Sequence, residues 1–338
     1  MINFNIPQNY RSDLDLIATQ KAIKSIKDNF ERNLAERLNL LRVSAPLFVK
    51  SSSGLNDDLT GVEKPVSFMV EETPGNKIQA EIVQSLAKWK RFALAQYKFR
   101  LGTGLYTDMN AIRADEVPDN THSYYVDQWD WEKVISIEER NLNYLHETVN
   151  SIFEAFLDLE NQLLEELPFY ESLLPEEVTF ISAQELEDLY PEYTPEERED
   201  LICKDKKFVF LEKIGHDLIS GIPHSARSPD YDDWTLNGDI LVWSPVINRA
   251  LELSSMGVRV DAKALLSQLE TAGATDRMRY PYHKKLLKNE LPLTIGGGIG
   301  QSRICMFFLQ KLHIGEVQAS IWPQEMIDSL KEEGIELL

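Results

Sequence analysis

The sequence predicts an α+β fold in which an antiparallel sheet is flanked by helices. Strand-like segments come in neighbouring pairs joined by short turns, and helix-like segments lie between those pairs. The strict strand–helix alternation of a doubly wound fold is missing. With 338 residues, 43% of them apolar, the chain can bury a substantial core.

The first predicted element is a long helix over about residues 18–39. Its apolar residues are spaced by three and four and therefore share one face: Ile23, Ile26, Phe30, Leu34 and Leu38. The stretch 41–49 is strand-like, but Pro46 cannot donate to a ladder, so this strand belongs at a sheet edge, a bulge or a partner interface. Residues 51–54 then form a loop.

A hairpin follows, with strands at 65–70 and 77–83. Residues 73–76 make its turn, because proline sets the second position and Gly75 accepts the positive φ of the third. Ser85 can cap the next helix, which runs to about residue 97.

Two further strands are predicted within 107–116 and 123–132, joined across a turn at 118–120. In the second strand Gln128 and Asp130 share one face. The other face carries Asp127, Trp129 and Trp131. A polar pair is therefore aimed at one side of the sheet, with aromatic residues behind it.

The second half of the chain begins with a predicted helix at 137–166. Residues 171–200 then hold eleven acidic residues and one basic residue, and we assign 167–206 to an acidic surface insertion. The remaining predicted elements are strands at 208–211, 237–244 and 250–260, helices at 261–270 and 282–290, and a glycine-rich loop at 296–300 that opens a helix through Leu309.

Composition bears on partners and compartment. The chain has 35 Lys and Arg against 55 Asp and Glu, a net charge of −20 that repels polyanions, so nucleic acid is not an expected partner. The two cysteines, Cys203 and Cys305, fit a reducing compartment. The chain shows neither a signal peptide nor an apolar run of membrane-spanning length, so we expect a cytoplasmic protein without a membrane partner.

The glycine-rich segment and two arginines are the first candidates for chemistry. Residues 296–300 could present N–H groups to an anion at a helix start, where Arg303 would add a guanidinium. The segment is neither GxxxxGK[ST] nor GxGxxG, and glycine clusters are often only tight turns. Arg113, on a predicted strand, is either a functional cation or an edge-strand cation paired with Glu116.

Asp239 and Glu252 are carboxylates on neighbouring predicted strands, and they could share a hard cation. The alternative is that both are solvated strand ends. By alternation Ser255, Gly257 and Arg259 share a face while Glu252 has the other parity. A bulge or bend is therefore needed to bring all of them into one site.

Two further clusters allow more than one interpretation. Lys88 and Lys90 share a predicted helix, and one helix rarely aims both such residues inward. The acidic cluster 230–234 could bind a metal or an amine, but such loops are usually solvent-facing turns. The histidines form neither HxxxH nor HxH, which argues against a catalytic zinc, and no nucleophile elbow supports a Ser-His-Asp triad.

Seven motifs, in order, resemble the ammonia-dependent asparagine synthetase family over about residues 18–325. They are SLAKWKR (85–91), GLYTDMNAIRADE (104–116), YVDQWDWE (125–132), PDYDDW (229–234), NGDILVW (237–243), ELSSMGVRVDA (252–262) and TIGGGIGQSR (294–303). That family looks like a class II aminoacyl-tRNA synthetase catalytic domain and is homodimeric. LRVSAPLF (41–48) resembles its dimer-forming first motif, the segment around Arg113 and Glu116 the second, and GGGIGQSR the third. The resemblance implies a single catalytic domain over 1–338, with an N-terminal extension at 1–17.

The resemblance also implies a reaction. ATP and L-aspartate would form β-aspartyl-AMP and pyrophosphate, after which ammonia would attack the activated carbonyl to give L-asparagine and AMP. ATP would be held by Arg113, Glu116, Gly298 and Arg303, whose guanidinium groups would neutralise charge on the phosphates. Mg²⁺ would be held by Asp239 and Glu252.

The family's pattern assigns the remaining residues to the amino acid and the ammonia. Aspartate carboxylates or adenylate oxygens would be held by Lys90, Ser255 and Arg259. The amino group or the reacting β-carboxyl would meet Asp57, Gln128 and Asp232, which with Arg113 and Arg303 would act in catalysis. Neutral ammonia is scarce at pH 7, so a carboxylate such as Asp57 could accept the proton. The chain departs from the family between residues 233 and 237, where the family has a longer loop.

Two alternatives remain open. An aminoacyl-tRNA synthetase would share the first chemical step, but the first-motif strand begins by residue 41, which leaves no room for an anticodon-binding barrel, and the net charge suits tRNA poorly. A catalytically silent paralogue would bind aspartate or asparagine and adenylate without turnover. A glutamine-dependent enzyme is excluded, because no cysteine stands near the N-terminus.

Overall fold

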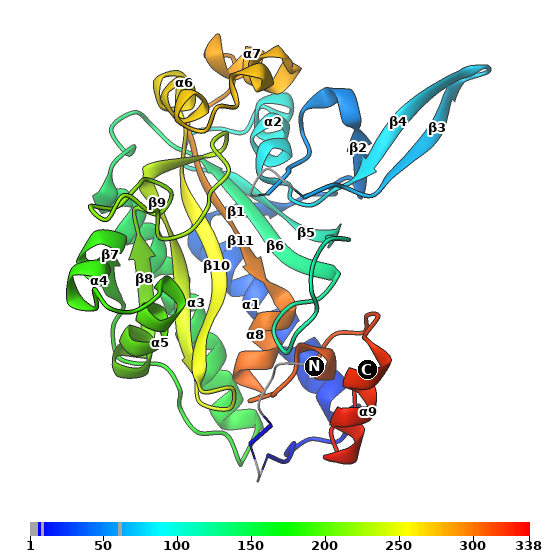
Figure 1. Cartoon of the computed structure of the whole chain (residues 1–338), viewed down its shortest axis with the longest axis vertical. Helices are drawn as coiled ribbons and strands as arrows, with labels where there is room; N and C mark the ends of the chain where they lie inside the picture. Colours follow the sequence, from blue (N-terminus) through cyan, green and yellow to red (C-terminus); the bar gives the residue numbers. More distant parts are fainter. Residues whose placement is uncertain (1–5, 8–9, 60–62) are drawn as a thin grey trace.

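The computed structural model describes residues 6–7, 10–59 and 63–338, and an eight-stranded sheet forms its centre (Figure 1). In spatial order the strands are β1 (Leu40–Arg42), β5 (Gly104–Ile112), β6 (Tyr125–Val134), β11 (Thr294–Gly300), β10 (Arg249–Arg259), β9 (Asp232–Ser244), β8 (Phe208–Glu212) and β7 (Thr179–Ser182). The predicted α+β class is confirmed. The sheet is mixed rather than wholly antiparallel, because its outermost pairings, β1 with β5 and β7 with β8, are parallel.

Three helices cover one face of this sheet: α1 (Leu16–Leu38), α3 (Leu142–Glu166) and α8 (Gln301–Phe308), of which α1 and α3 lie behind the sheet in Figure 1. The predicted apolar face of α1 is buried, and the ring centre of Phe30 lies 5.1 Å from that of Trp129 and 4.8 Å from that of Phe156. Trp129 and Trp131 of β6 belong to this core. Because side chains alternate along a strand, Gln128 and Asp130 point to the opposite, polar face, as predicted.

Three further helices gather at one end of the sheet: α2 (Ala87–Tyr97), α6 (Ala262–Thr271) and α7 (Pro281–Leu287). The Ser85 hydroxyl accepts a hydrogen bond from Ala87 N (3.1 Å), which is close to its predicted capping role, although Leu86 holds the N-cap position. The short helices η2 (Thr275–Arg279), η3 (Ile314–Glu316) and α9 (Gln324–Glu332) complete the later part of the chain.

A separate three-stranded sheet carries the predicted hairpin. Its strands are β2 (Phe48–Lys50), β4 (Asn76–Ile82) and β3 (Ser67–Thr73), and the hairpin projects from the body of the molecule (Figure 1). Gly75 has the expected positive φ, +80°. The prediction of one strand over 41–49 is wrong: β1 and β2 belong to different sheets, because Pro46 lacks an N–H and restrains the residue before it. The predicted loop at 51–54 is a 3₁₀ turn, η1 (Ser51–Ser53).

The acidic segment 167–206 is more than the predicted surface insertion, because it also adds a strand to the central sheet. It supplies strand β7 and the helices α4 (Ala183–Leu189) and α5 (Pro195–Lys206). Ile181, Leu186 and Ile202 form an apolar cluster with β8. Some of its acidic residues have a local role, since Glu185 and Glu197 close capping boxes at the starts of α4 and α5.

Three sequence predictions are corrected within the central sheet. The glycine-rich segment is strand β11 rather than a loop, and Arg113 follows β5 instead of lying on it. Strand β9 runs from Asp232 to Ser244, so the acidic cluster 230–234 starts in a turn and continues into a strand. Asp230, Asp232 and Asp233 are buried, so the expectation of a solvent-facing turn is wrong. The expected bulge is confirmed, because the pairing of β9 with β10 shifts register between Glu252 and Ser254.

At the N-terminus, residues 1–5 and 8–9 of the predicted extension lie outside the described residues, whereas Tyr10 donates a hydrogen bond to Glu316 (2.9 Å). Both cysteines are buried free thiols. Among the described residues, no helix combines the length and the apolar character needed to cross a membrane.

Candidate active site

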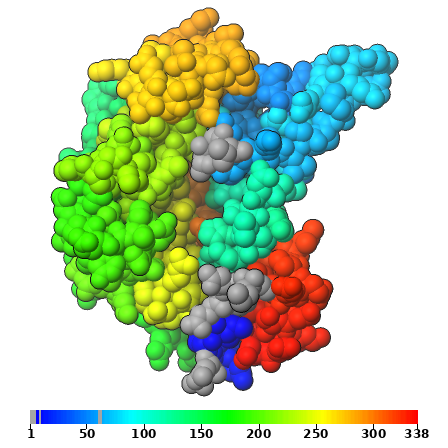
Figure 2. Space-filling view, in the orientation of Figure 1, coloured from blue at the N-terminus to red at the C-terminus, as the bar shows by residue number. Residues whose placement is uncertain are grey.

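A cleft of about 340 Å³ lies on the polar face of the sheet. Figure 2 shows it as a hollow between the teal segment near residue 120 and the yellow-green segment of β9 and β10, with β11 at its base. Every predicted site residue except Asp239 lines this cleft: Asp57, Lys90, Arg113, Glu116, Gln128, Asp232, Glu252, Ser255, Arg259, Gly298 and Arg303. Asp239 lies directly beneath it, paired with Ser255 across β9 and β10.

Strand β11 forms the floor of the cleft, and the side chains around it explain why it contains several glycines. A Cβ atom on Gly298 would lie 2.5 Å from Gln128 Oε1, and one on Gly296 would overlap the Glu132 carboxylate. Gly297 faces the core, where a Cβ atom would lie 2.6 Å from that of Met256. The glycines are therefore required because neighbouring side chains cross the strand. Their backbone groups pair with β6 and β10, so the segment is a strand and not a loop that presents N–H groups at a helix start.

Lys90 anchors one end of the cleft. Its Nζ donates to Asp130 Oδ1 (2.5 Å) and to the Gly297 carbonyl (2.7 Å), and the side chain is fully buried. Burial lowers the pKa of Lys90, and Asp130 opposes this shift. Lys88 is buried too, 3.3 Å from Asp230, so the expectation that α2 would aim only one lysine inward is wrong. Each lysine is accommodated because it meets its own buried carboxylate.

Arg259 lies beside Lys90 and is held on two sides by carboxylates. Its Nη2 lies 2.8 Å from Glu132 Oε2, and its Nη1 pairs with Asp232. Burial alone would lower the pKa of Arg259, but Asp232 and Glu132 outweigh burial and raise it. The guanidinium is therefore permanently charged and fixed in orientation.

Asp57 is a buried carboxylate at the same end of the cleft. Ser228 Oγ lies 3.4 Å from its Oδ1, and its Oδ2 has no hydrogen-bond partner among the described residues. Burial raises the pKa of Asp57 to about 6, while Lys88 lowers it and Asp230 raises it further. A carboxylate with this pKa and a free oxygen can accept a proton near neutral pH.

Asp230, behind Asp57, is the centre of a buried polar cluster. Its carboxylate accepts hydrogen bonds from Ser228 (2.9 Å) and lies 3.1 Å from Arg277 and 2.9 Å from His283, in addition to Lys88. Arg277 also donates to Asp58 (2.5 Å). This cluster ties the segment that carries Asp57 to η2 and α7.

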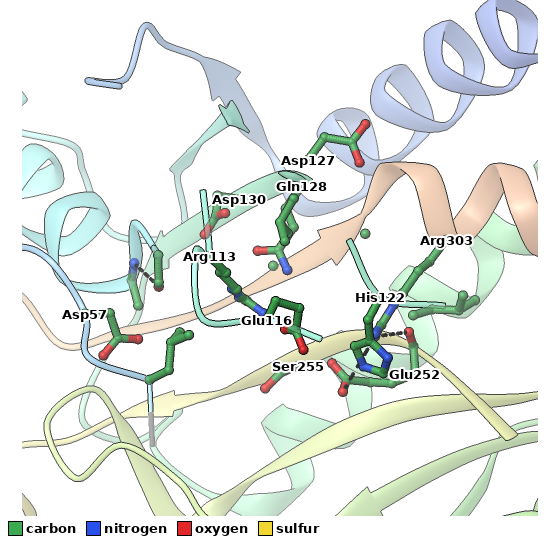
Figure 3. A pocket seen from close by; sticks show the side chains of 18 of the residues that line it. Asp57, Arg113, Glu116, His122, Asp127, Gln128, Asp130, Glu252, Ser255 and Arg303 are labelled. Carbon is green, nitrogen blue, oxygen red and sulfur yellow. Dashed lines mark hydrogen bonds and ion pairs between the residues drawn. The ribbon is translucent and has the colours of Figure 1, made fainter. Parts of the chain in front are cut away.

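The opposite end of the cleft carries the guanidinium of Arg303. In Figure 3 Asp57 lies at one end, and Arg303, Glu252 and His122 lie at the other. Arg303 Nη1 donates to the Glu252 carbonyl (2.9 Å). Arg113 lies between the two ends; its buried Nε has no hydrogen-bond partner, and within the described chain it forms no ion pair with Glu116, contrary to the edge-strand alternative.

Asp239 and Glu252 are the predicted metal ligands. The bulge brings Glu252 to the cleft face, and Asp239 Oδ1 is buried without a hydrogen-bond partner in the described structure. Burial raises the pKa of Asp239, Arg227 opposes the shift and Glu252 adds to it. The described residues contain no cluster of three or more potential metal ligands. Two carboxylates nevertheless fit Mg²⁺, which commonly takes its other ligands from water and substrate phosphates.

Sequence reasoning missed several residues of the cleft. Glu132 has the same parity as Gln128 and Asp130, so the alternation of β6 could have revealed it. Arg227 lies in an irregular segment between β8 and β9, where no periodicity indicates the direction of a side chain. The cluster around Asp230 joins residues distant in sequence and has no local signal.

The arrangement of helices and strands defines the class of protein. Similar solved structures include asparaginyl-tRNA synthetase from Pyrococcus horikoshii complexed with asparaginyl-adenylate, with a TM-score of 0.61 and 16% identity, covering 90% of this chain and 70% of that one. Asparaginyl-tRNA synthetase from Entamoeba histolytica gives 0.60 and 14%, covering 90% and 67%. At these identities the likeness shows the fold alone. The chain has the class II aminoacyl-tRNA synthetase fold.

Sequence comparison identifies the particular family. The family model described as aspartate–ammonia ligase matches residues 17–334. The protein named aspartate–ammonia ligase of Clostridium tetani is 59% identical over 333 residues, 98% of this chain and 97% of that one. Its counterpart from Bacillus cytotoxicus is 56% identical over 328 residues, 97% and 99%. The chain belongs to the aspartate–ammonia ligase family, which confirms the resemblance carried by the seven motifs.

Proposed function

We propose that the protein makes L-asparagine from L-aspartate and ammonia, with ATP converted to AMP and pyrophosphate through β-aspartyl-AMP. The observation that carries this proposal is the division of one cleft into two ends. The buried acid Asp57 lies at one end, and Arg303 with Glu252 lies at the other, with Arg113 between them (Figure 3). Lys90 and Arg259 also line the cleft. A carboxylate substrate and a triphosphate can therefore meet at Arg113.

Adenylation is the first step. The β-carboxylate of aspartate attacks the α-phosphorus of ATP, and pyrophosphate leaves. Arg113, whose Nε lacks a partner among the described groups, would neutralise charge on the α-phosphate, and Arg303 charge on the departing pyrophosphate. Glu116 and Gly298 would complete the nucleotide site. Mg²⁺ held by Asp239 and Glu252 would neutralise phosphate charge.

Aspartate would be oriented by groups that the protein already holds rigidly. Lys90 and Arg259 would bind its carboxylates, and Ser255 would donate to a carboxylate or an adenylate oxygen. Gln128 and Asp232 would meet its amino group. The lysine and the arginine are both buried and ion-paired. Binding of the substrate would therefore require little further ordering of these two side chains.

Amide formation is the second step. Ammonia attacks the activated carbonyl, its nitrogen loses a proton, and AMP leaves. Asp57 would accept that proton, from ammonium before the attack or from the attacking amine, because its buried carboxylate has a free oxygen and a pKa near 6.

We also propose a cytoplasmic homodimer. The two buried free thiols fit a reducing compartment. Leu41, Leu47 and Phe48, around the first-motif segment, are exposed large apolar residues and would be covered by a second copy. Light scattering that gave a monomer at working concentration would contradict the dimer.

The decisive assay supplies ATP, Mg²⁺, L-aspartate and ammonium, omits each in turn, and measures asparagine, AMP and pyrophosphate. Asparagine with stoichiometric AMP supports the proposal. Aspartate-dependent exchange of pyrophosphate into ATP without asparagine would indicate an adenylating relative with another acceptor. Silence in both assays would favour a protein that binds without turnover.

A further inference from the structure

Arg227 is a cation of the cleft that the steps above do not use. It lies between β8 and β9, and its guanidinium reaches the sheet, where Nη1 donates to Ser255 Oγ (2.6 Å) and Nη2 to Asp239 Oδ2. Its side chain is 14% exposed, and its Nε is buried without a hydrogen-bond partner in the described structure. The arginine therefore binds one of the two carboxylates proposed to hold Mg²⁺.

Arg227 and a divalent cation compete for the same carboxylate. With the guanidinium on Oδ2, a cation at the other oxygen of Asp239 would lie close to a fixed positive charge. Two unit charges 4 Å apart repel by about 4 kcal/mol at an effective dielectric constant of about 20. A divalent cation alone is thus opposed at this site, whereas a triphosphate would supply negative charge to both cations.

Residues on both sides of Arg227 are held by hydrogen bonds. His224 Nε2 lies 2.8 Å from Glu199 Oε1 on α5, and Ser228 Oγ donates to Asp230 (2.9 Å). The Ser228 carbonyl also accepts from Trp234 Nε1 (3.3 Å). The guanidinium can therefore change partners by rotation of its side chain.

We propose that Arg227 makes divalent-cation binding depend on nucleotide: without nucleotide it holds Asp239 and disfavours the cation, and with ATP it turns to the triphosphate and leaves Asp239 to the cation. The inference deepens the proposed function and rests on it for the nucleotide site. By thermodynamic reciprocity the cation and the nucleotide then increase each other's affinity, and Arg227 contributes part of that coupling.

The test measures binding without turnover. Mn²⁺ serves as the probe, with free Mn²⁺ followed by electron paramagnetic resonance, in the presence and absence of α,β-methylene-ATP, which cannot be cleaved at the reacting bond. Wild type is expected to bind Mn²⁺ weakly alone and at least tenfold more tightly with the analogue. Arg227→Gln is expected to bind Mn²⁺ alone about tenfold more tightly than wild type, about 1.4 kcal/mol, and the analogue alone more weakly.

Three variants serve as controls. Arg249→Gln removes an exposed arginine of β10 and should bind both probes like wild type. Asp239→Asn added to Arg227→Gln should abolish the gain in Mn²⁺ affinity, which places the ion at Asp239. Arg227→Lys keeps the charge and should bind both probes more like wild type. It shows whether the effect of Arg227→Gln comes from the lost charge or from misfolding after a substitution at this position.

Two results would overturn the proposal. One is Mn²⁺ affinity in Arg227→Gln no greater than in wild type. The other is no Mn²⁺ binding even with the analogue. Because neither readout requires asparagine formation, the coupling can hold when the synthesis assay fails, and the two failures are distinguishable.

Discussion

Glu132 and Arg259 form a buried ion pair that crosses over Gly296, with 2.8 Å between Glu132 Oε2 and Arg259 Nη2. The strands that carry them, β6 and β10, are the two neighbours of β11, so the pair bridges strands that are not hydrogen-bonded to each other. Thr294 Oγ1 donates to the second oxygen of Glu132 (2.7 Å). The glycine thus allows an arginine to be fixed where aspartate is expected to bind.

Alanine at Gly296 would push a Cβ atom into the Glu132 carboxylate and displace Arg259. We expect the KM for aspartate in pyrophosphate exchange to rise about tenfold or more, and the free energy of unfolding to fall by about 1–3 kcal/mol. Gly297→Ala is the matched comparison, because its Cβ atom would meet Met256 in the core. It should lose stability with a smaller change in KM, and equal KM changes in the two variants would contradict this role of Gly296.

Asp57→Asn separates the two chemical steps. The amide keeps the size of the side chain but cannot accept a proton, so asparagine formation should fall about 100-fold or more. Aspartate-dependent pyrophosphate exchange should stay within about twofold of wild type, because that step does not use the carboxylate. Rapid-quench measurement of both steps checks this, and an equal loss in both would rule out the assigned role.

The sequence predicted individual helices and hairpins better than the contacts between segments that are distant along the chain. Helix α1 and the hairpin follow from local signals, apolar spacing and turn residues, and both are confirmed. The glycine-rich segment was misassigned because glycine frequency signals a turn when only neighbours along the chain are considered. The reason for Gly296 and Gly298 lies in side chains from other strands, which no local pattern contains.

In the candidate site, too, features with a local sequence signal were predicted, whereas features that depend on distant residues were not. The parity of Glu252 predicted a bulge, and the register shift beside it confirms that inference. The burial of both Lys88 and Lys90 was not predictable from helix geometry, since it depends on Asp230 and Asp130, which come from distant segments. Arg227 escaped notice for a similar reason, because its partners lie on β9 and β10.

The ionised carboxylate of Asp57 should destabilise the folded protein at neutral pH. Burial raises its pKa from 3.8 to about 6, so the folded state binds a proton in this interval that the unfolded state has released. Stability attributable to this group is therefore lost as pH rises from about 4 to 6, and the full cost remains above that interval. Asp57→Asn should be more stable than wild type by about 1–3 kcal/mol at pH 7.5 and nearly equal to it near pH 4. Urea unfolding at both pH values tests this, and an equal difference at the two values would contradict it.

Lys88 should set the pH at which Asp57 becomes active. The lysine opposes the effect of burial on the pKa of Asp57, whereas Asp230 and Asp58 raise it. Lys88→Met should therefore move the midpoint of amide formation upward from about pH 6 by about one pH unit, while pyrophosphate exchange is largely retained.

The profile for Lys88→Met is measured by single-turnover amide formation from preformed adenylate, with the concentration of neutral ammonia held constant across the pH range. Lys88→Arg keeps the charge and should restore the wild-type midpoint. Lys77→Met, on the exposed hairpin, should leave the profile unchanged. A midpoint that stayed in place in Lys88→Met, with amide formation merely scaled down at every pH, would show that Lys88 supports the fold around Asp230 rather than the charge state of Asp57.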